Sequence, residues 1–181
     1  MASLFSHPAV PLALGVMLGG KRLPARYWVL GTIASMAPDI DVLAFRFGIP
    51  YEAPLGHRGG THSILFAAIL AALFTFREWR HWPRHSVLFL YLFVSALSHP
   101  LLDMLTDGGL GIALLYPFST ERFFFPWRPI AVSPIGGAFF SQSGLEVIGS
   151  ELKWIWLPSV GIAAIWLAMQ RLLARPPHAR S

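Results

Sequence analysis

Long apolar stretches separated by short basic clusters are the feature that most constrains the fold of this chain. A water-soluble domain carries about 25% charged residues, whereas this sequence has 13%, with 55% hydrophobic residues. Apolar residues gathered in blocks are typical of helices that cross a bilayer. Five blocks are visible: Ser3–Gly20, Tyr27–Phe47, His62–Phe76, Ser86–Leu105 and Trp154–Met169. The sequence therefore predicts an all-α integral membrane bundle of about five transmembrane helices, forming one domain over residues 1–170.

The stretch between the fourth and fifth blocks, Thr106–Lys153, is too long for an ordinary loop and is rich in aromatic residues and proline. We expect it to form an interfacial segment that covers part of the bundle. The first block contains Pro8 and Pro11. A re-entrant helix is therefore an alternative to a full crossing there.

The basic residues indicate how the helices are oriented. They cluster after the first, third and fifth blocks, at Lys21–Arg26, Arg77–Arg84 and Arg171–Arg180. The positive-inside rule then places these clusters, and a basic tail over residues 171–181, on the cytoplasmic side. A nucleic-acid-binding surface would more often place its basic residues along one stripe, so no nucleic-acid partner is expected. The sequence leaves the oligomeric state open.

Polar residues in the later part of the fourth block need partners. His99, Asp103 and Asp107 are spaced i, i+4 and i+8, so a helix points all three to one side. Histidine and carboxylate side chains are costly in hydrocarbon unless they are paired or bound to a metal. In the second block, Pro38 should break or kink the helix and let Asp39 and Asp41 turn inward.

The predicted topology brings the polar residues to one level of the membrane. After the second block, a loop ends in His57 and His62, and Thr61 is the expected N-cap of the third helix. With the basic clusters inside, all the candidate ligands fall at the outer ends of their blocks. The candidate metal ligands are His7, Asp39, Asp41, His57, His62, His99, Asp103 and Asp107.

This set of residue types indicates a hydrolytic metal. Histidine and carboxylate ligands without cysteine suit zinc, with manganese as an alternative. Two such metals would polarise a phosphoryl oxygen and generate a hydroxide nucleophile near neutral pH. Asp39 or Asp41, if not a ligand, could act as general base. Arg58, Arg122 and Arg128 are candidates for binding the phosphate of a substrate.

Structural explanations remain open for several of these residues. Asp39 and Asp41 could cap helix ends or pair with an arginine. His57 and His62 could be interfacial side chains that reach toward water. Asp107 precedes two glycines and could simply end its helix.

The order of these motifs resembles the YdjM-like bacterial inner-membrane proteins, a family of predicted membrane-bound, metal-dependent hydrolases. The matching pieces are His7, Ala37-Pro38-Asp39-Ile40-Asp41, His57-Arg58-Gly59-Gly60-Thr61-His62-Ser63, Ser98-His99-Pro100-Leu101-Leu102-Asp103 and Tyr116-Pro117-Phe118-Ser119. The resemblance covers roughly residues 1–134. It implies a multi-pass protein of the bacterial cytoplasmic (inner) membrane.

The family is in turn distantly similar to zinc-dependent phospholipase C and related single-strand nucleases, which are all-helical. That similarity implies that His7, Asp39, His57, His99 and Asp103 are metal ligands, with His62 and Asp41 as further ligands or as their hydrogen-bonding partners. The phospholipases take additional histidine and glutamate ligands from a later helix, whereas this chain has no histidine between Asp107 and His178. The expected cofactor is therefore one or two metal ions.

Two functions are predicted on these grounds. The first is a metal-dependent hydrolase that uses a metal-activated water to cleave a phosphoester, with its site facing the periplasm. The substrate would be a membrane lipid or lipid-linked phosphate, whose headgroup lies at the depth of the ligands. The alternative is a non-catalytic membrane protein with a structural or an ion- or proton-conducting His/Asp cluster.

Overall fold

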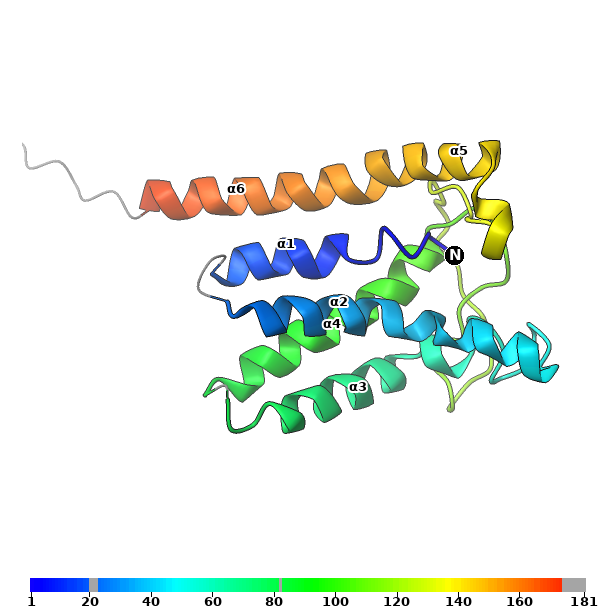
Figure 1. Ribbon diagram of the computed structural model, residues 1–181, viewed down its shortest axis with the longest axis horizontal. Coiled ribbons are helices and arrows are strands. Elements are labelled where there is room, and N and C mark those ends of the chain that lie inside the picture. The colour runs from blue at the N-terminus through cyan, green and yellow to red at the C-terminus, as the bar shows by residue number, and fades with distance from the viewer. Residues whose placement is uncertain (20–22, 82, 174–181) are drawn as a thin grey trace, which may run out of the picture.

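The structure is a computed structural model that describes residues 1–19, 23–81 and 83–173 (Figure 1). Within these ranges the chain is all-helical, as predicted, and it contains two isolated bridges, Thr106–Ile130 and Ile112–Phe123, but no strand. Lys21, Arg22 and residues 174–181 of the predicted basic tail lie outside the described ranges. The helices are α1 (Ala9–Leu18), α2 (Ala25–Met36), η2 (Ala37–Phe47), η3 (Gly60–His62), α3 (Ile64–Arg77), α4 (His85–Met104), η4 (Gly136–Phe139), α5 (Gln142–Glu151), η5 (Leu152–Trp156) and α6 (Leu157–Leu173).

Among the described residues, three helical stretches are long and apolar enough to cross a membrane: Ala25–Phe47, His85–Met104 and Gln142–Leu173. The first and third predicted blocks form shorter helices, α1 with 10 residues and α3 with 14. At 1.5 Å per residue these helices are about 15 and about 21 Å long, less than the roughly 30 Å of a bilayer core. Three candidate spans are therefore present, together with two shorter apolar helices.

Pro38 ends α2, as the sequence indicates. The α-helix stops at Met36, and the chain continues as the 3-10 helix η2, which carries Pro38 in its first turn. Both Asp39 and Asp41 lie in η2 and are buried. The predicted N-cap of α3 is wrong, because the Ser63 side chain accepts the hydrogen bond from the backbone of Phe66 and caps the helix.

The last helix is longer than its hydropathy indicates. α5, the π-helix η5 and α6 form one stretch of 32 residues, Gln142–Leu173. The predicted start at Trp154 is wrong, because the first two turns contain Gln142, Gly144 and Glu146 and lack a continuous apolar pattern. The irregular segment after α4 therefore ends at Ser141.

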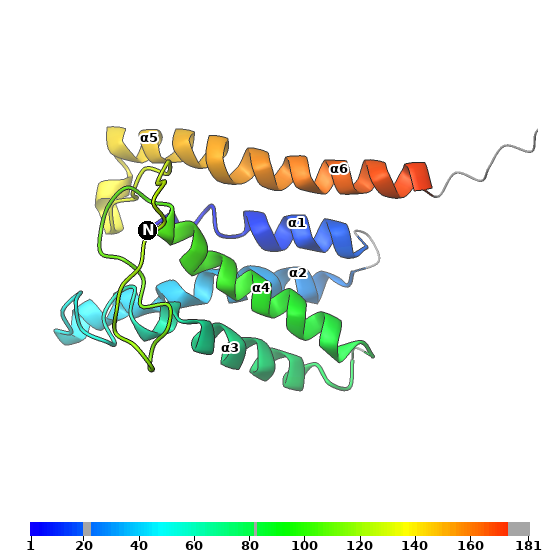
Figure 2. The ribbon, with the colours of Figure 1, turned by 180° about the vertical axis from the view of Figure 1, so that it is seen from behind.

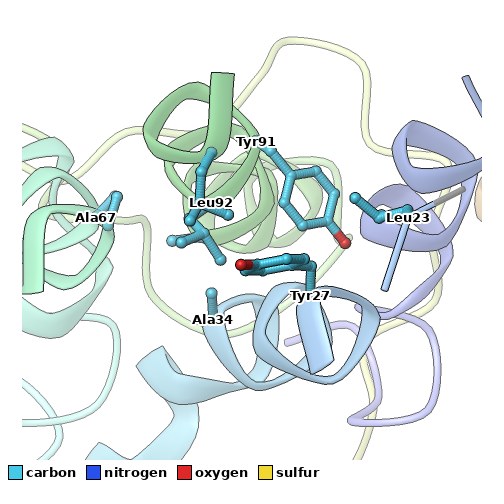
Figure 3. Close-up of a cluster of buried hydrophobic side chains, with 9 residues drawn as sticks. Leu23, Tyr27, Ala34, Ala67, Tyr91 and Leu92 are labelled. Atoms are coloured by element: carbon cyan, nitrogen blue, oxygen red, sulfur yellow. The ribbon is translucent and has the colours of Figure 1, made fainter. Parts of the chain in front are cut away.

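The main hydrophobic core lies between α2, α3 and α4. Figure 3 shows Tyr27 of α2 and Tyr91 of α4 packed together in this core. The small residue Gly31 makes this approach possible, because a Cβ there would lie 2.2 Å from the Tyr91 Oη. The contact between α2 and α4 holds in place the helix ends that carry the polar residues.

The helices place charge and polar residues at opposite ends of the bundle. Figures 1 and 2 show the N-terminal segment, the end of α4, α5 and the region of η2 and η3 at one end. The C-terminal ends of α3 and α6 and the start of α4 lie at the other end. There the described basic residues include Arg26, Arg77, Arg84 and Arg171. The buried histidines and aspartates gather at the first end.

Candidate metal centre

Seven of the eight predicted ligands lie in one buried cluster where η2, η3, α4 and the segment before α1 meet. Two groups of potential ligand atoms can be distinguished, His7–His99–Asp103 and Asp39–His57–His62, and within each group the atoms lie within 4.8 Å of one another. The groups are adjacent, because the His62 Nε2 and His99 Nε2 atoms are 3.1 Å apart. Asp39 Oδ1 lies 3.3 Å from His99 Nε2. The arrangement has the dimensions of a site for one or two ions.

Hydrogen-bond acceptors fix the Nδ1-protonated tautomer of His57, His62 and His99. The Nδ1 of His57 lies 2.6 Å from Asp41 Oδ1, and the Nδ1 of His62 lies 3.1 Å from Asp41 Oδ2. The Nδ1 of His99 lies 2.7 Å from the carbonyl oxygen of Ser35. Because carboxylate and carbonyl oxygens only accept, each Nδ1 carries the proton and donates it. In its neutral form each ring therefore presents an Nε2 lone pair to the cluster.

The Nε2 atoms of His62 and His99 face each other. Two Nε2 lone pairs 3.1 Å apart repel each other unless a proton or a cation lies between them. Histidines that donate Nδ1–H to a carboxylate or carbonyl oxygen and present Nε2 inward have the arrangement of metal-ligating histidines. The geometry therefore fits a metal ion.

Asp41 accepts hydrogen bonds that orient His57 and His62. Besides the two imidazoles, it accepts hydrogen bonds from Thr61 Oγ1 at 2.6 Å and from the backbone nitrogen of Arg58 at 3.2 Å. Its oxygens are thus occupied by donors from the protein. Asp41 orients His57 and His62, and it belongs to neither group of potential ligand atoms.

Six buried polar atoms of the candidate ligands have no hydrogen-bond partner. They are both ring nitrogens of His7, both carboxylate oxygens of Asp39, His57 Nε2 and Asp103 Oδ2. Such atoms are rare in folded proteins, and each costs about 1–3 kcal/mol. One or two bound divalent cations would satisfy one ligand atom of each residue, and this donor set of nitrogen and carboxylate oxygen suits zinc or manganese.

The charges of the buried side chains also favour a cation. The cluster holds the carboxylates of Asp39, Asp41 and Asp103 and the guanidinium of Arg58. With neutral histidines, three negative charges face one positive side chain. Burial of unbalanced charge is strongly unfavourable, and a divalent ion would supply the balance.

His7 and His62, which lie outside the candidate membrane spans, are held in the neutral form. His7 precedes α1 and is fully buried, and its ring stacks on His99 with 3.6 Å between centroids. Burial lowers the pKa of His7 to about 3. Burial also lowers the pKa of His62, which ends η3. Neutral imidazole is the form that binds a metal.

Arg58 is buried, and each nitrogen of its guanidinium has a partner within the protein. Its Nε lies 3.3 Å from Asp103 Oδ2, and its terminal nitrogens donate to the carbonyl oxygens of Gly108 and Leu110 and to Thr106 Oγ1. The backbone of Arg58 has a φ of 62°, a left-handed conformation that costs energy for a residue other than glycine. The structure therefore gives Arg58 the role of ordering the loop after α4 and balancing Asp103.

The other two arginines predicted to bind substrate differ from each other. Arg122 donates to backbone carbonyl oxygens, including those of His57 and Arg58 at 3.3 and 3.2 Å, and so ties the two loops together. Arg128 is exposed, with its guanidinium carbon 4.7 Å from the centroid of the Phe124 ring. A phosphate-binding role stays a prediction for both.

Asp107 is the predicted ligand that the structure does not bring to the cluster. It is exposed, and its Oδ1 accepts a hydrogen bond from the backbone of Val132 at 2.8 Å. The i, i+8 spacing fails because α4 ends at Met104, three residues earlier. Asp107 therefore fastens two loops and lies outside both groups of potential ligands.

The sequence did not single out Glu151 as a site residue. This buried carboxylate accepts hydrogen bonds from the backbone and side chain of Ser3 and from Ser6 Oγ, at 2.6 and 2.7 Å for the two hydroxyls. Ser6 directly precedes His7, so Glu151 fixes the segment that delivers this histidine. A lone glutamate far along the chain gives no spacing signal for such a role.

The fold and the site together define a class of protein: a helical membrane protein with a buried histidine–aspartate cluster at one end of its bundle. Over residues 1–175 the chain matches the family described as YdjM inner membrane protein. It therefore belongs to that family, as the sequence motifs indicated.

The chain is also similar to the inner membrane protein YbcI of Escherichia coli (strain K12). The two are 45% identical over 163 residues, which cover 88% of this chain and 94% of the relative. No solved structure matches. Membership of this family and the three candidate spans make the chain a protein of the inner membrane.

Proposed function

We propose that this protein is a membrane-embedded, metal-dependent hydrolase that cleaves a phosphoester of a lipid or lipid-linked substrate. The observation that carries the proposal is the convergence of oriented Nε2 lone pairs with carboxylate oxygens that have no hydrogen-bond partner. Such a constellation holds a catalytic metal in hydrolases that use histidine and carboxylate ligands. The mixed ligand set, with no cysteine in the chain, favours zinc over softer metals.

Six residues of the cluster would bind the metal. His7, His57, His62, His99, Asp39 and Asp103 would hold one or two ions. Bound zinc would polarise the phosphoryl oxygen and lower the pKa of a water molecule to near neutrality.

Of the two predicted aspartates, Asp39 is the better general base, a role it would fill with the carboxylate oxygen that does not hold the metal. Its carboxylate oxygens accept no hydrogen bond, whereas those of Asp41 are occupied by donors from the protein. As a base, Asp39 would take the proton of the attacking water.

The position of the cluster favours a substrate at the outer face of the membrane. The described arginines at the opposite end of the bundle belong on the cytoplasmic side by the positive-inside rule. The cluster then faces the periplasm, near the level of lipid headgroups. A phosphate at this depth lies beside the metal ligands without leaving the bilayer surface.

The proposal is tested by a hydrolysis assay on the detergent-purified protein loaded with zinc or manganese. The substrates are phospholipids and polyprenyl phosphates, and the product is released phosphate or headgroup. We expect turnover by the wild type and a loss of at least about 100-fold in His99→Ala, since a ligand is removed. His85→Ala is the matched control, because His85 lies at the other end of α4. Equal rates in all three proteins, or none with any substrate, would favour the non-catalytic alternative.

A further inference from the structure

Two cavities lie at the end of the bundle that holds the cluster. The larger, of about 680 Å³, is a groove between α5 and the segment before α1, lined by residues that include Phe5, Leu145, Ile148 and Trp156. The smaller, of about 300 Å³, is lined by residues that include Asp39, Leu4 and Val42. Both volumes are in the range of small-molecule sites.

The two cavities are neighbours, and the smaller one reaches the cluster. Phe5, Phe139 and Phe140 line both of them. Asp39 is 8% exposed and lines the smaller cavity, and its two carboxylate oxygens, which accept no hydrogen bond, are buried behind that wall. A molecule that occupied both cavities would therefore have one end at Asp39 and the other in the groove along α5.

The walls of the groove are hydrocarbon, and its polar groups are already satisfied. Glu151 accepts hydrogen bonds from Ser3 and Ser6, and the Ser141 hydroxyl donates to the carbonyl oxygen of Ala138 at 2.7 Å. No described side chain in the groove carries a positive charge. The groove therefore suits an apolar chain, while a phosphate at the Asp39 end needs the metal ion of the cluster beside it to offset the Asp39 carboxylate.

The groove is also open to a chain that comes from the bilayer. Gln142–Leu173 has 32 residues, or about 48 Å of helix, so it exceeds a bilayer core of roughly 30 Å and α5 reaches the headgroup level. Leu145 is 64% exposed and Leu152 is 52% exposed along this groove. Large apolar side chains exposed at this level are ready to contact lipid.

We propose that the groove along α5 binds an acyl chain of a phospholipid whose phosphate lies at the Asp39 end of the smaller cavity. The inference rests on the proposed function and deepens it. It makes the substrate a phospholipid, held by its chain, and it assigns Phe5, Phe139 and Phe140 to the wall between chain and headgroup.

Photo-cross-linking locates the chain without any need for turnover. The probe is a phosphatidylethanolamine with a diazirine in one acyl chain, added in equimolar amount to the zinc-loaded wild type in detergent micelles. Mass spectrometry then compares labelling at Leu145, Ile148 and Leu152 with labelling at the outer face of α6. We expect labelling of the groove residues to exceed that of α6 by roughly tenfold, because a shaped site retains the chain.

Two matched substitutions test whether the groove itself is responsible. Leu145→Trp fills the groove and should reduce its labelling roughly tenfold, since a bulky side chain occupies the space of the chain. Leu157→Trp is the control, because Leu157 is similarly exposed, at 66%, and lies outside both cavities. Zinc content should remain at the wild-type value in both variants, which shows that they fold.

The outcomes separate this inference from the proposed function. Labelling spread evenly over the groove and α6, or a Leu145→Trp variant that labels like Leu157→Trp, would overturn the chain site. If such a protein still hydrolyses phosphoesters, the proposed function stands without it. Preferential labelling of the groove in a protein that hydrolyses nothing supports the chain site and contradicts the proposed function.

Discussion

Asp39 and Asp41, two aspartates of η2, differ in their hydrogen bonding. Asp41 accepts hydrogen bonds from two imidazoles, a hydroxyl and a backbone nitrogen, whereas the oxygens of Asp39 accept none. Both side chains are buried, so this difference is not one of solvent access. Asp41 is therefore assigned to positioning the histidines and Asp39 to the metal. Their spacing in the sequence, which is the same for any Asp-x-Asp pair, cannot separate these roles.

We expect Asp41→Asn to weaken zinc binding by about 10–100-fold without abolishing it, because Asp41 acts through two ligands. Asp39→Asn should weaken binding further, since it replaces a carboxylate that faces the ion. Asp107→Asn is the control, because Asp107 lies outside both groups of ligand atoms. Titration against a chelator measures all three affinities. An Asp41→Asn protein that binds zinc like Asp107→Asn would refute the positioning role.

At the scale of helices, the contact of α2 with α4 sets the geometry of the site. α2 continues into η2 with Asp39 and Asp41, and α4 carries His99 and Asp103. The two helices approach closely where Gly31 meets the ring of Tyr91. A side chain at Gly31 would separate the helices that deliver these polar residues.

We predict that Gly31→Ala lowers stability by about 1–3 kcal/mol, because its Cβ would overlap the Tyr91 hydroxyl. Gly161→Ala in α6 is the matched control. Nothing lies within 4 Å of a Cβ at Gly161, so alanine should stabilise that helix by roughly 0.5–1 kcal/mol. Thermal unfolding in detergent measures both. A Gly31→Ala protein as stable as Gly161→Ala would show that the α2–α4 approach is not tight.

The positions of most helices could be predicted from the sequence, whereas several helix termini could not. Pro38 marked the end of α2, because proline cannot continue the hydrogen-bonding of an α-helix. Hydropathy alone missed α5, whose first turns are polar, and the α3 cap fell on Ser63 instead of Thr61. Within the site, the i, i+4 pair of His99 and Asp103 was visible in the sequence. The burial of Arg58 depends on a loop fifty residues away, which spacing cannot show.

The whole molecule is polarised along its helices. Polar groups with metal-binding geometry lie at one end, and Arg77 and Arg171 lie at helix termini at the other. The buried core between these ends is mostly apolar, with Ala67, Ala71, Leu88 and Leu92 in its centre. This arrangement favours a site at one membrane surface over a path through the membrane.

Reporter fusions test this polarity. One reporter is inserted at Gly137 in η4, where a Cβ would meet open space, and the other follows Ser181. We expect the reporter at Gly137 in the periplasm and the one after Ser181 in the cytoplasm, since Arg171 at the end of α6 favours the inner side. Reporters on the same side would contradict the proposed orientation.

The central claim is that the buried histidine–aspartate cluster holds a metal. Elemental analysis of the detergent-purified protein tests it most directly, with the wild type beside a His99→Ala, Asp103→Ala double variant and a His81→Ala control. We predict about one to two zinc or manganese ions per wild-type or control chain and almost none in the double variant. A folded wild type that holds no metal after incubation with zinc and manganese would contradict the account.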